Sequence, residues 1–266
     1  MENPPRSFYD KLFWMSVHTD TSLWSALADK VQVRAYISKR CGSEILTDLY
    51  ATYDKAESVD FDALPTSFAI KTNNGCGANY LVKSKTEVDL EDIRRSLRYW
   101  LAFPYGELTG QMHYARIVPQ ILVEELLFQA HNPNATLVDY KFYCFNGVPR
   151  YCYVVSERQF DQKHSHSRMM YDMEWHPMPD VFVKGKPLSF VERPAALERM
   201  KSVSSRLSEG IPFVRVDLYE VNGEVKFSEM TFLPGMDPGY TETFQSKLGG
   251  LIELPPSTLP THAGRG

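Results

Sequence analysis

Cysteine is scarce in this sequence, and the four cysteines form no recognisable motif. Cys41, Cys76, Cys144 and Cys152 include no CxxC pair and no spacing typical of a zinc site. We therefore interpret them as reduced thiols of a cytoplasmic protein. Cys144 and Cys152 flank a predicted turn, and a disulfide between them is the less favoured alternative.

Long apolar runs, basic clusters and internal repeats are also missing. No apolar run approaches the roughly 20 residues that span a bilayer. The first residues, MENPPRSFYDKLFW, have neither the basic start nor the continuous apolar stretch of a signal peptide. Basic residues are scattered, and a net charge of −4 with a pI near 6.0 indicates no surface for nucleic acid or anionic lipid. We expect no nucleic-acid partner and no membrane insertion.

The composition is that of a globular protein with a sizeable core. Of the 266 residues, 43% are hydrophobic and 23% are charged. Hydrophobic periodicity predicts helices in the first sixty residues, over 89–103 with Asp89 as N-cap, and over 194–210 with Gly210 as C-cap. Alternating patterns predict strands or hairpins over 67–84, 118–128, 139–158 and 213–235. The fold class is therefore α+β, with antiparallel sheets and helices packed on them.

The hairpin over 213–235, FVRVDLYEVNGEVKFSEMTFLPG, carries acids where apolar residues are expected. Asn222-Gly223 suits a type I′ turn, which places Asp217 and Glu229 near cross-strand register. Two carboxylates this close repel each other strongly unless a divalent ion lies between them, and oxygen-only ligation is what Mg²⁺ prefers. The alternative is that Asp217 pairs with Arg215 and Glu229 with Lys226.

Several cations are candidates to meet a bound anion. Lys30 follows an aspartate, whereas Lys71 and Lys141 lie in strand patterns, where lysines ordinarily point to solvent. Together with Arg215 they are suited to surround a nucleoside triphosphate with Mg²⁺. The loop NNGCG after Lys71 has glycines that let backbone N–H groups approach phosphate oxygens. No GK[ST] follows, so it is no Walker A loop, and a plain hairpin turn explains it equally well.

These motifs, taken in order, resemble a known family. DKVQVRAYI, FAIKTNNGCG, DYKFYCFNG and PFVRVDLYEVNGEVKFSEMTFLPG are similar to the TupA-like branch of the ATP-grasp superfamily, associated with bacterial surface-glycan and teichuronopeptide synthesis. The similarity covers about Phe8 to Glu253. It implies an ATP-grasp-like fold of two α+β subdomains whose antiparallel sheets grip a nucleotide, after a short helical N-terminal segment. We divide the chain into that segment (1–60), a glycine-loop subdomain with a hinge strand (61–135), a C-terminal catalytic subdomain (136–253) and a flexible tail (254–266).

The resemblance implies the activity of an ADP-forming carboxylate–amine ligase that forms an amide bond through an acyl phosphate. Its cofactors would be ATP and one or two Mg²⁺ ions, with Mn²⁺ as an alternative. Its substrates would be a small-molecule or glycan-linked carboxylate, such as a uronic acid of a surface polysaccharide, and an amine. A sugar or glycan kinase on the same fold is one alternative, and a non-catalytic nucleotide-binding module is another.

The resemblance also implies roles for particular residues. Phosphate-binding lysines are Lys30, Lys71 and Lys141, and the arginine at the acyl centre is Arg215. The loop that closes over the phosphates is formed by Asn73, Asn74, Gly75, Cys76 and Gly77. The backbone that binds the adenine edge belongs to Glu124, Glu125, Leu126 and Leu127. The metal ligands are Asp217, Glu229 and Thr231.

Two departures from the superfamily pattern leave questions open. Thr231 stands where asparagine is frequent, and a hydroxyl is the weaker ligand, so the number of metal ions is open. The N-terminal part is short, so a protein partner or a second copy of the chain is an alternative source of part of the acceptor pocket. His164 and His166 are interpreted as a mobile loop, and Arg158 and Arg168 either as ligands of an acidic substrate or as solvated surface.

Overall fold

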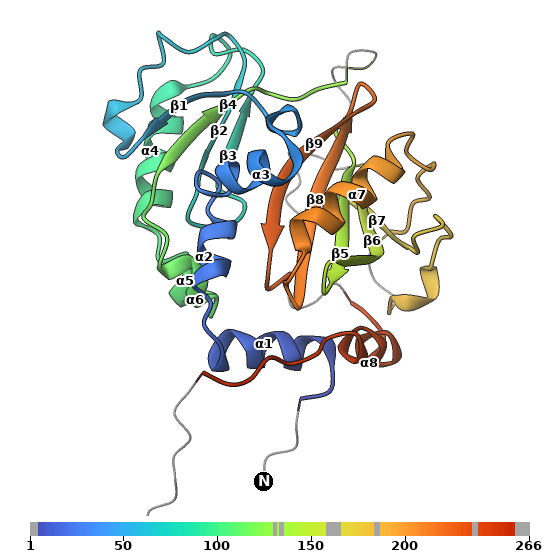
Figure 1. Ribbon diagram of the computed structural model, residues 1–266. Coiled ribbons are helices and arrows are strands. Elements are labelled where there is room, and N and C mark those ends of the chain that lie inside the picture. Colours follow the sequence, from blue (N-terminus) through green and yellow to red (C-terminus); the bar gives the residue numbers. More distant parts are fainter. Residues whose placement is uncertain are drawn as a thin grey trace, which may run out of the picture.

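The computed structural model describes residues 5–129, 132, 136–157, 166–183, 187–235 and 239–258 (Figure 1). Arg158, His164 and the predicted tail beyond 258 lie outside the described residues. The predicted tail, 254–266, is described as far as Thr258, whose backbone N–H donates to the carbonyl of His18 at 2.7 Å. Within the described ranges, no helix is long and apolar enough to cross a membrane.

Two antiparallel sheets form the framework. The four-stranded sheet has the order β1-β4-β2-β3 and the five-stranded sheet the order β7-β6-β5-β8-β9. The strands of the first are β1 (Leu49–Tyr53), β2 (Phe68–Thr72), β3 (Asn79–Val82) and β4 (Ile121–Glu124). Those of the second are β5 (Asp139–Phe145), β6 (Val148–Ser156), β7 (Ser167–Tyr171), β8 (Phe213–Val221) and β9 (Glu224–Thr231). The predicted α+β class with antiparallel sheets is confirmed.

Helices cover the sheets and join them (Figure 1). In Figure 1, α4 lies along the four-stranded sheet and α7 along the five-stranded one, while α2 and α3 lie between the sheets and α1 and α8 pack together at one end. The α-helices are α1 (Phe8–His18), α2 (Ser22–Ala28), α3 (Val33–Cys41), α4 (Leu90–Ala102), α5 (Tyr105–Leu108), α6 (Met112–Ala115), α7 (Leu197–Ser208) and α8 (Glu242–Gly250). Short 3₁₀ turns are η1 (Ser43–Ile45), η2 (Ala56–Ser58) and η3 (Pro179–Val181).

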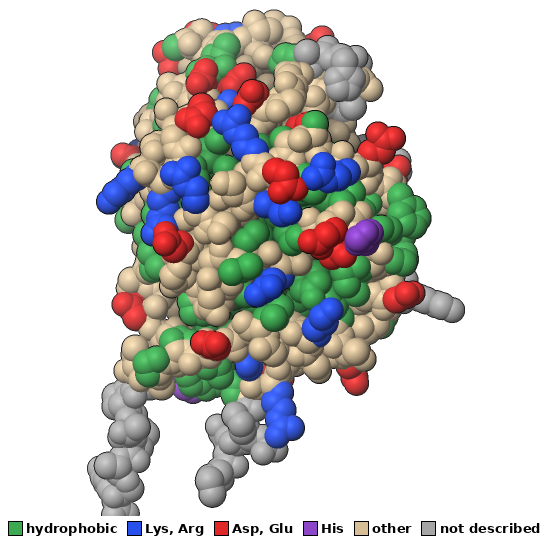
Figure 2. All heavy atoms as spheres, turned by 45° about the vertical axis from the view of Figure 1, so that its right-hand side comes forward, with side chains coloured by type: hydrophobic (Ala, Val, Ile, Leu, Met, Phe, Trp, Pro, Cys, Tyr) green, Lys and Arg blue, Asp and Glu red, His purple; other side chains and the backbone are tan. Residues whose placement is uncertain are grey.

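Each sheet has its own apolar core. One core lies between the four-stranded sheet and α4, whose Ile93 and Leu97 are buried. The other joins the five-stranded sheet to the N-terminal helices, α7 and α8. Figure 2 shows acidic, basic and apolar side chains interspersed on one face of the molecule. The core under each sheet holds the site-bearing strands rigid at the place where the two sheets meet.

Two helix ends lie where the sequence predicted them, the start of α4 and the end of α7. The Asp89 carboxylate accepts hydrogen bonds from the N–H groups of Glu91 and Asp92, as an N-cap does. Gly210 follows α7 with a φ of +75°, which confirms the predicted C-cap region. The four cysteines are free thiols, so Cys144 and Cys152 form no disulfide.

The last hairpin has the predicted turn and register. Asn222 and Gly223 adopt φ values of +53° and +82°, as a type I′ turn requires at both central positions. Asp217 lies directly opposite Glu229, and Arg215 lies opposite Thr231. A bulge between Asp217 and Leu218 shifts the register that the turn sets by one residue, and this shift brings Glu229 rather than Ser228 opposite Asp217. These four side chains therefore share one face of the sheet.

Candidate active site

Asp217 is the centre of the cluster on the five-stranded sheet. Its side chain is completely buried, and both carboxylate oxygens accept hydrogen bonds from cations. Arg215 donates from Nε to Oδ1 at 2.7 Å and from Nη2 to Oδ2 at 2.6 Å. Lys141, directly opposite on β5, donates from Nζ to Oδ2 at 2.6 Å. The short, charge-assisted bonds fix all three side chains in one arrangement.

Glu229 and Thr231 complete the cluster from β9. Nη2 of Arg215 donates to Glu229 Oε1 at 3.1 Å and to the Thr231 hydroxyl oxygen at 3.0 Å. Lys226 instead donates to the carbonyl oxygens of Glu44 and Leu46.

Of the two ion pairs that the sequence suggested as an alternative to a metal ion, one is present. Asp217 does pair with Arg215, but Glu229 does not pair with Lys226. The expected repulsion between the two acids is present, since the charge of Glu229 contributes to the raised pKa of Asp217, and Arg215 and Lys141 offset it.

The two carboxylates titrate differently. Burial works against ionisation of Glu229, but the charges of Arg215, Lys141 and Lys30 outweigh it and hold the pKa of Glu229 at about 2. For Asp217, complete burial is the largest effect and raises the pKa above its ordinary value, against the opposing charges of Arg215 and Lys141. Glu229 is thus an anion at neutral pH, with a quarter of its side chain exposed.

The donor set fits Mg²⁺. Asp217, Glu229 and Thr231 offer only oxygen atoms, and Mg²⁺ is usually held by one or two carboxylates, with substrate phosphates and water completing its shell. Among the residues that the structure describes, no group of three or more His, Cys, Asp or Glu side chains is placed to hold a metal ion by itself. A metal ion at this cluster would therefore depend on phosphate oxygens as well.

The glycine loop connects β2 to β3 and is tied to the N-terminal helices. Lys30 donates from Nζ to the Gly75 carbonyl oxygen at 2.6 Å. A Cβ added at Gly75 would lie 2.9 Å from the Tyr105 ring, so no larger residue fits without displacement. The Cys76 thiol is exposed and lies 3.4 Å from the Tyr114 hydroxyl. Gly77 has a φ of +73°, which favours glycine.

Asn73 holds the loop in place. Its amide nitrogen donates to Asp29 Oδ1 and to the Val118 carbonyl, both at 3.0 Å, and its Oδ1 accepts from the Gln120 N–H at 2.7 Å. The side chain is fully buried, so it is an anchor of the loop here and makes its contacts within the protein. The Asn74 amide nitrogen donates to the Trp100 carbonyl at 3.3 Å.

Lys71 forms an ion pair with Glu124 on the neighbouring strand β4. Glu124 is buried and also accepts from Arg34 Nη1 at 2.9 Å. The signal for Arg34 in the sequence is its position four residues after Lys30 in DKVQVR, one helical turn along.

Beyond β4, the predicted adenine-binding segment begins as a strand and continues as irregular chain. The Glu125 N–H donates to the Asp48 carbonyl at 2.8 Å. The backbone groups of Leu126 and Leu127 make no hydrogen bond with another described residue. These two residues therefore offer free donors and acceptors to a ligand at the edge of the sheet.

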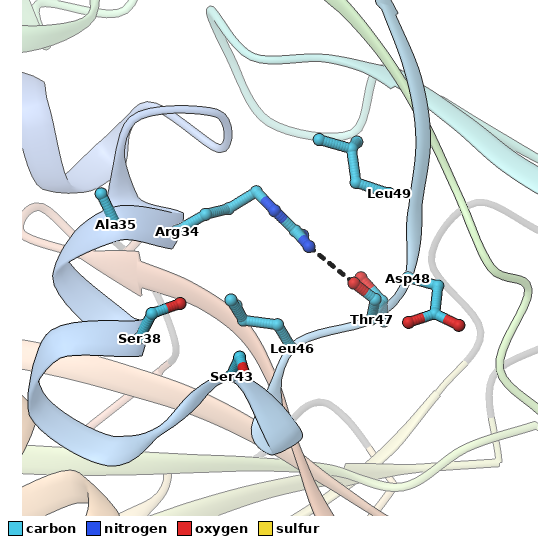
Figure 3. Close-up of a pocket in the computed structure, with 8 residues that line it drawn as sticks. All are labelled: Arg34, Ala35, Ser38, Ser43, Leu46, Thr47, Asp48 and Leu49. Atoms are coloured by element: carbon cyan, nitrogen blue, oxygen red, sulfur yellow. Dashed lines mark hydrogen bonds between the residues drawn. The ribbon is translucent and has the colours of Figure 1, made fainter.

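Two hollows mark the place where the sheets meet. A small one of about 10 Å³ is lined by the phosphate-binding candidates and by β9: Lys30, Arg34, Leu46, Thr47, Lys71, Glu124, Phe227 and Ser228. It adjoins a larger cavity of about 390 Å³ between α3, η1 and β1, across which Arg34 reaches the Thr47 carbonyl (Figure 3). Lys30, Lys71 and Glu124 thus lie together beside β9, which also carries Glu229 and Thr231.

Arg168 lies on β7, which β6 separates from the β5 strand that carries Lys141. It is buried on β7, with its guanidinium 4.4 Å from the Phe182 ring centre, so the solvated-surface alternative does not hold for it. His166 is described and partly buried at the start of the same strand region, whereas His164 falls outside the described residues.

The two sheets, with lysines and acids between them, have the arrangement of the ATP-grasp class. D-alanine–D-alanine ligase from Bacillus anthracis superposes with a TM-score of 0.51 at 17% identity, over 88% of this chain and 66% of that chain. The chain belongs to the TupA-like ATP-grasp family, whose family model matches residues 10–253. The predicted family is therefore confirmed, and with it the predicted ATP-grasp enzyme class.

Two further solved structures are similar to this chain with TM-scores below 0.5. The Bacillus anthracis ligase complexed with ATP has a TM-score of 0.49 at 16% identity, over 88% of this chain and 64% of that chain. Macrocyclase MdnC bound with precursor peptide MdnA, from Microcystis aeruginosa MRC, has a TM-score of 0.41 at 11% identity, over 88% and 63%. This chain thus spans slightly less than two thirds of the length of these proteins. No curated protein matches the sequence.

Proposed function

We propose that this protein is an ATP-dependent carboxylate–amine ligase that forms an amide bond through an acyl phosphate. The observation that carries the proposal is the cluster of Lys141, Arg215, Asp217 and Glu229 on one sheet face. The charge of Lys30 acts on Glu229, and Lys30 and Lys71 line the hollow beside β9. Two lysines and an arginine around two carboxylates, with Lys71 nearby, are suited to a polyphosphate with its metal ion. Family membership supports the same activity.

The lysines of the chain bind and orient the nucleotide. Lys30 and Lys71 come from the N-terminal segment and β2, and Lys141 comes from β5, so they approach a polyphosphate from both sheets. Charge-assisted hydrogen bonds from these ammonium groups place the terminal phosphorus in line with an attacking substrate carboxylate. When bound through Asp217, Glu229 and Thr231, Mg²⁺ would neutralise the charge that develops on the phosphates.

For Arg215 we propose contact with the acyl centre. Its Nε and Nη2 are engaged by Asp217, Glu229 and Thr231, whereas Nη1 makes no hydrogen bond with a described residue. The hydrogen bonds of Nε and Nη2 fix the plane of the guanidinium group. Nη1 is left to contact the oxygen of the acyl phosphate or of the tetrahedral intermediate. Donors fixed before the reaction stabilise developing charge most effectively.

For the substrates, we propose a uronic acid or a related acid of bacterial surface-polysaccharide biosynthesis, and an amine. The TupA-like family is the support for this choice. Because the reaction consumes ATP, we place it in the cytoplasm.

Product analysis tests the proposed reaction. Purified protein is incubated with Mg-ATP, uronic acids and sugar nucleotides as acids, and amino acids as amines. A ligase releases ADP and inorganic phosphate in equal amounts only when both the acid and the amine are present. A product that retains phosphate would show a kinase instead, and the absence of any Mg-ATP-induced rise in Tm would contradict nucleotide binding altogether.

A further inference from the structure

The nucleotide site contains an anion of the chain itself. Glu124 lies on β4 between β1 and β2, and its side chain is only 6% exposed. Its Oε1 accepts from Arg34 at 2.9 Å, and its Oε2 pairs with Lys71. A buried carboxylate requires a cation nearby, because an isolated buried charge is strongly destabilising. Glu124 has two cations.

The ion pair competes with the proposed use of Lys71. A lysine that binds phosphate must direct its ammonium group at the phosphate, yet here it is held by Glu124. The hollow beside it measures about 10 Å³, which is about the least that holds a single water molecule. This hollow is therefore too small for a phosphate group while the ion pair and its neighbours keep their positions.

Arg34 can remain paired with Glu124 when Lys71 moves away from it. If Lys71 turns to a phosphate, Glu124 keeps Arg34 as its partner and is not left as an unpaired buried charge. The guanidinium is itself anchored, since Nη2 donates to the Thr47 carbonyl at 2.7 Å (Figure 3). It therefore stays beside Glu124 without help from the nucleotide.

We propose that Arg34 is a positioning residue that releases Lys71 from Glu124 so that Lys71 can bind the phosphates of ATP. The proposal rests on the proposed function, because it takes Lys71 to be a phosphate ligand. It assigns Arg34 no contact with the nucleotide. Arg34 affects ATP binding only through the charge of Glu124. A direct ligand of ATP, or a residue that only supports the fold, would affect binding whether or not Glu124 is charged.

A double-mutant cycle tests this dependence. Dissociation constants for Mg-ATP are measured by titration calorimetry, without acid or amine, for the wild type, R34A, E124Q and R34A/E124Q. We expect R34A to weaken binding about tenfold, a coupling of the size found for residues in one ion-pair network. In the E124Q background no buried carboxylate remains to hold Lys71, so the same substitution should change the dissociation constant by less than about twofold.

The matched control is R40A. Arg40 lies on the same helix, α3, and pairs with the exposed Glu209. It does not line the hollow. Its removal should leave Mg-ATP binding unchanged. If R34A does not fold, R34Q takes its place, because it retains a donor toward Thr47 but not the charge.

An equal loss of affinity from R34A in both backgrounds would overturn the proposal, since Arg34 would then act on the nucleotide directly or on the fold. No loss in the wild-type background would overturn it as well. If the wild type itself does not bind Mg-ATP, the proposed function fails, and this result is distinct from both.

Discussion

Replacement of Asp217 by asparagine tests the charge balance of the hairpin cluster. Asp217 accepts three hydrogen bonds of 2.6–2.7 Å from Arg215 and Lys141 and has no exposed surface. Asparagine has nearly the same shape, but its amide NH₂ group would face an N–H donor of Arg215 or Lys141, to which it cannot hydrogen-bond. Asp217→Asn therefore loses at least one hydrogen bond and leaves two buried cations with less negative charge around them.

The expected loss follows from the remaining partners. Removing one member of a buried ion pair typically destabilises a protein by about 3–5 kcal/mol. Arg215 retains Glu229 at 3.1 Å and Lys141 retains Asp139 at 3.6 Å, so we expect the lower end, about 3 kcal/mol. For a chain of this size that loss lowers Tm by about 6–12 °C.

The assay is calorimetric and urea-induced unfolding of the wild type, Asp217→Asn and a control, Glu198→Gln. Glu198 also pairs with two cations, Arg193 and Lys201, but its side chain is 67% exposed. The control should change stability by less than about 1 kcal/mol, because exposed pairs contribute little. An Asp217→Asn variant as stable as the wild type, or more stable, would refute the reasoning, since repulsion between Asp217 and Glu229 would then dominate the cluster.

Three further expectations concern neighbouring residues. Arg215→Lys keeps the charge but loses the planar donor set, so Mg-ATP affinity should be nearly normal while ligation slows by roughly 10²–10³-fold, as calorimetry and rate measurements would show. The folded pKa of Glu229, about 2, lies below its ordinary 4.5. Its stabilisation is therefore present above the ordinary value and lost as pH falls toward 2, and Glu229→Gln should flatten the stability–pH curve in that window; an unchanged curve would contradict the pKa. Gly75→Ala places a methyl group 2.9 Å from Tyr105 and should weaken Mg-ATP binding, whereas Gly250→Ala, with nothing within 4 Å, should not; equal affinities would show that the loop accommodates the methyl.

The hairpin of the active site was predictable because its signals are local. Strand alternation has a period of two, and Asn222-Gly223 determines the turn, so the two strands and their approximate pairing follow from the sequence. Counting back from the turn places Asp217 opposite Ser228; the bulge after Asp217 shifts the register by one residue and brings Glu229 opposite it, and no local pattern signals this bulge. The N-cap at Asp89 is a local signal too. Strand β1 was missed: Leu49–Tyr53 is a short edge strand whose formation depends on β4, some 70 residues further on.

The ion pairs across the site were not predictable from sequence patterns. Glu124 pairs with Lys71 on the adjacent strand and with Arg34 on a helix 90 residues earlier, and these contacts exist only once the sheet and α3 pack together. The contacts of Asn73 were not predictable either. Its place in the glycine loop suggested a phosphate contact, whereas in the fold its side-chain amide anchors the loop to Asp29 and Gln120. The roles assigned to the site residues remain predictions.

The measurement that tests the central claim most directly follows oxygen from the acid to the phosphate. Glucuronic acid labelled with ¹⁸O in its carboxylate is incubated with the protein, Mg-ATP and a panel of amino acids, and the released phosphate is analysed by mass spectrometry. Attack of the carboxylate on the terminal phosphorus, followed by displacement by the amine, transfers one labelled oxygen to the phosphate. The account predicts ¹⁸O-labelled phosphate together with ADP and an amide product. Unlabelled phosphate, or a phosphorylated sugar in place of the amide, would contradict it.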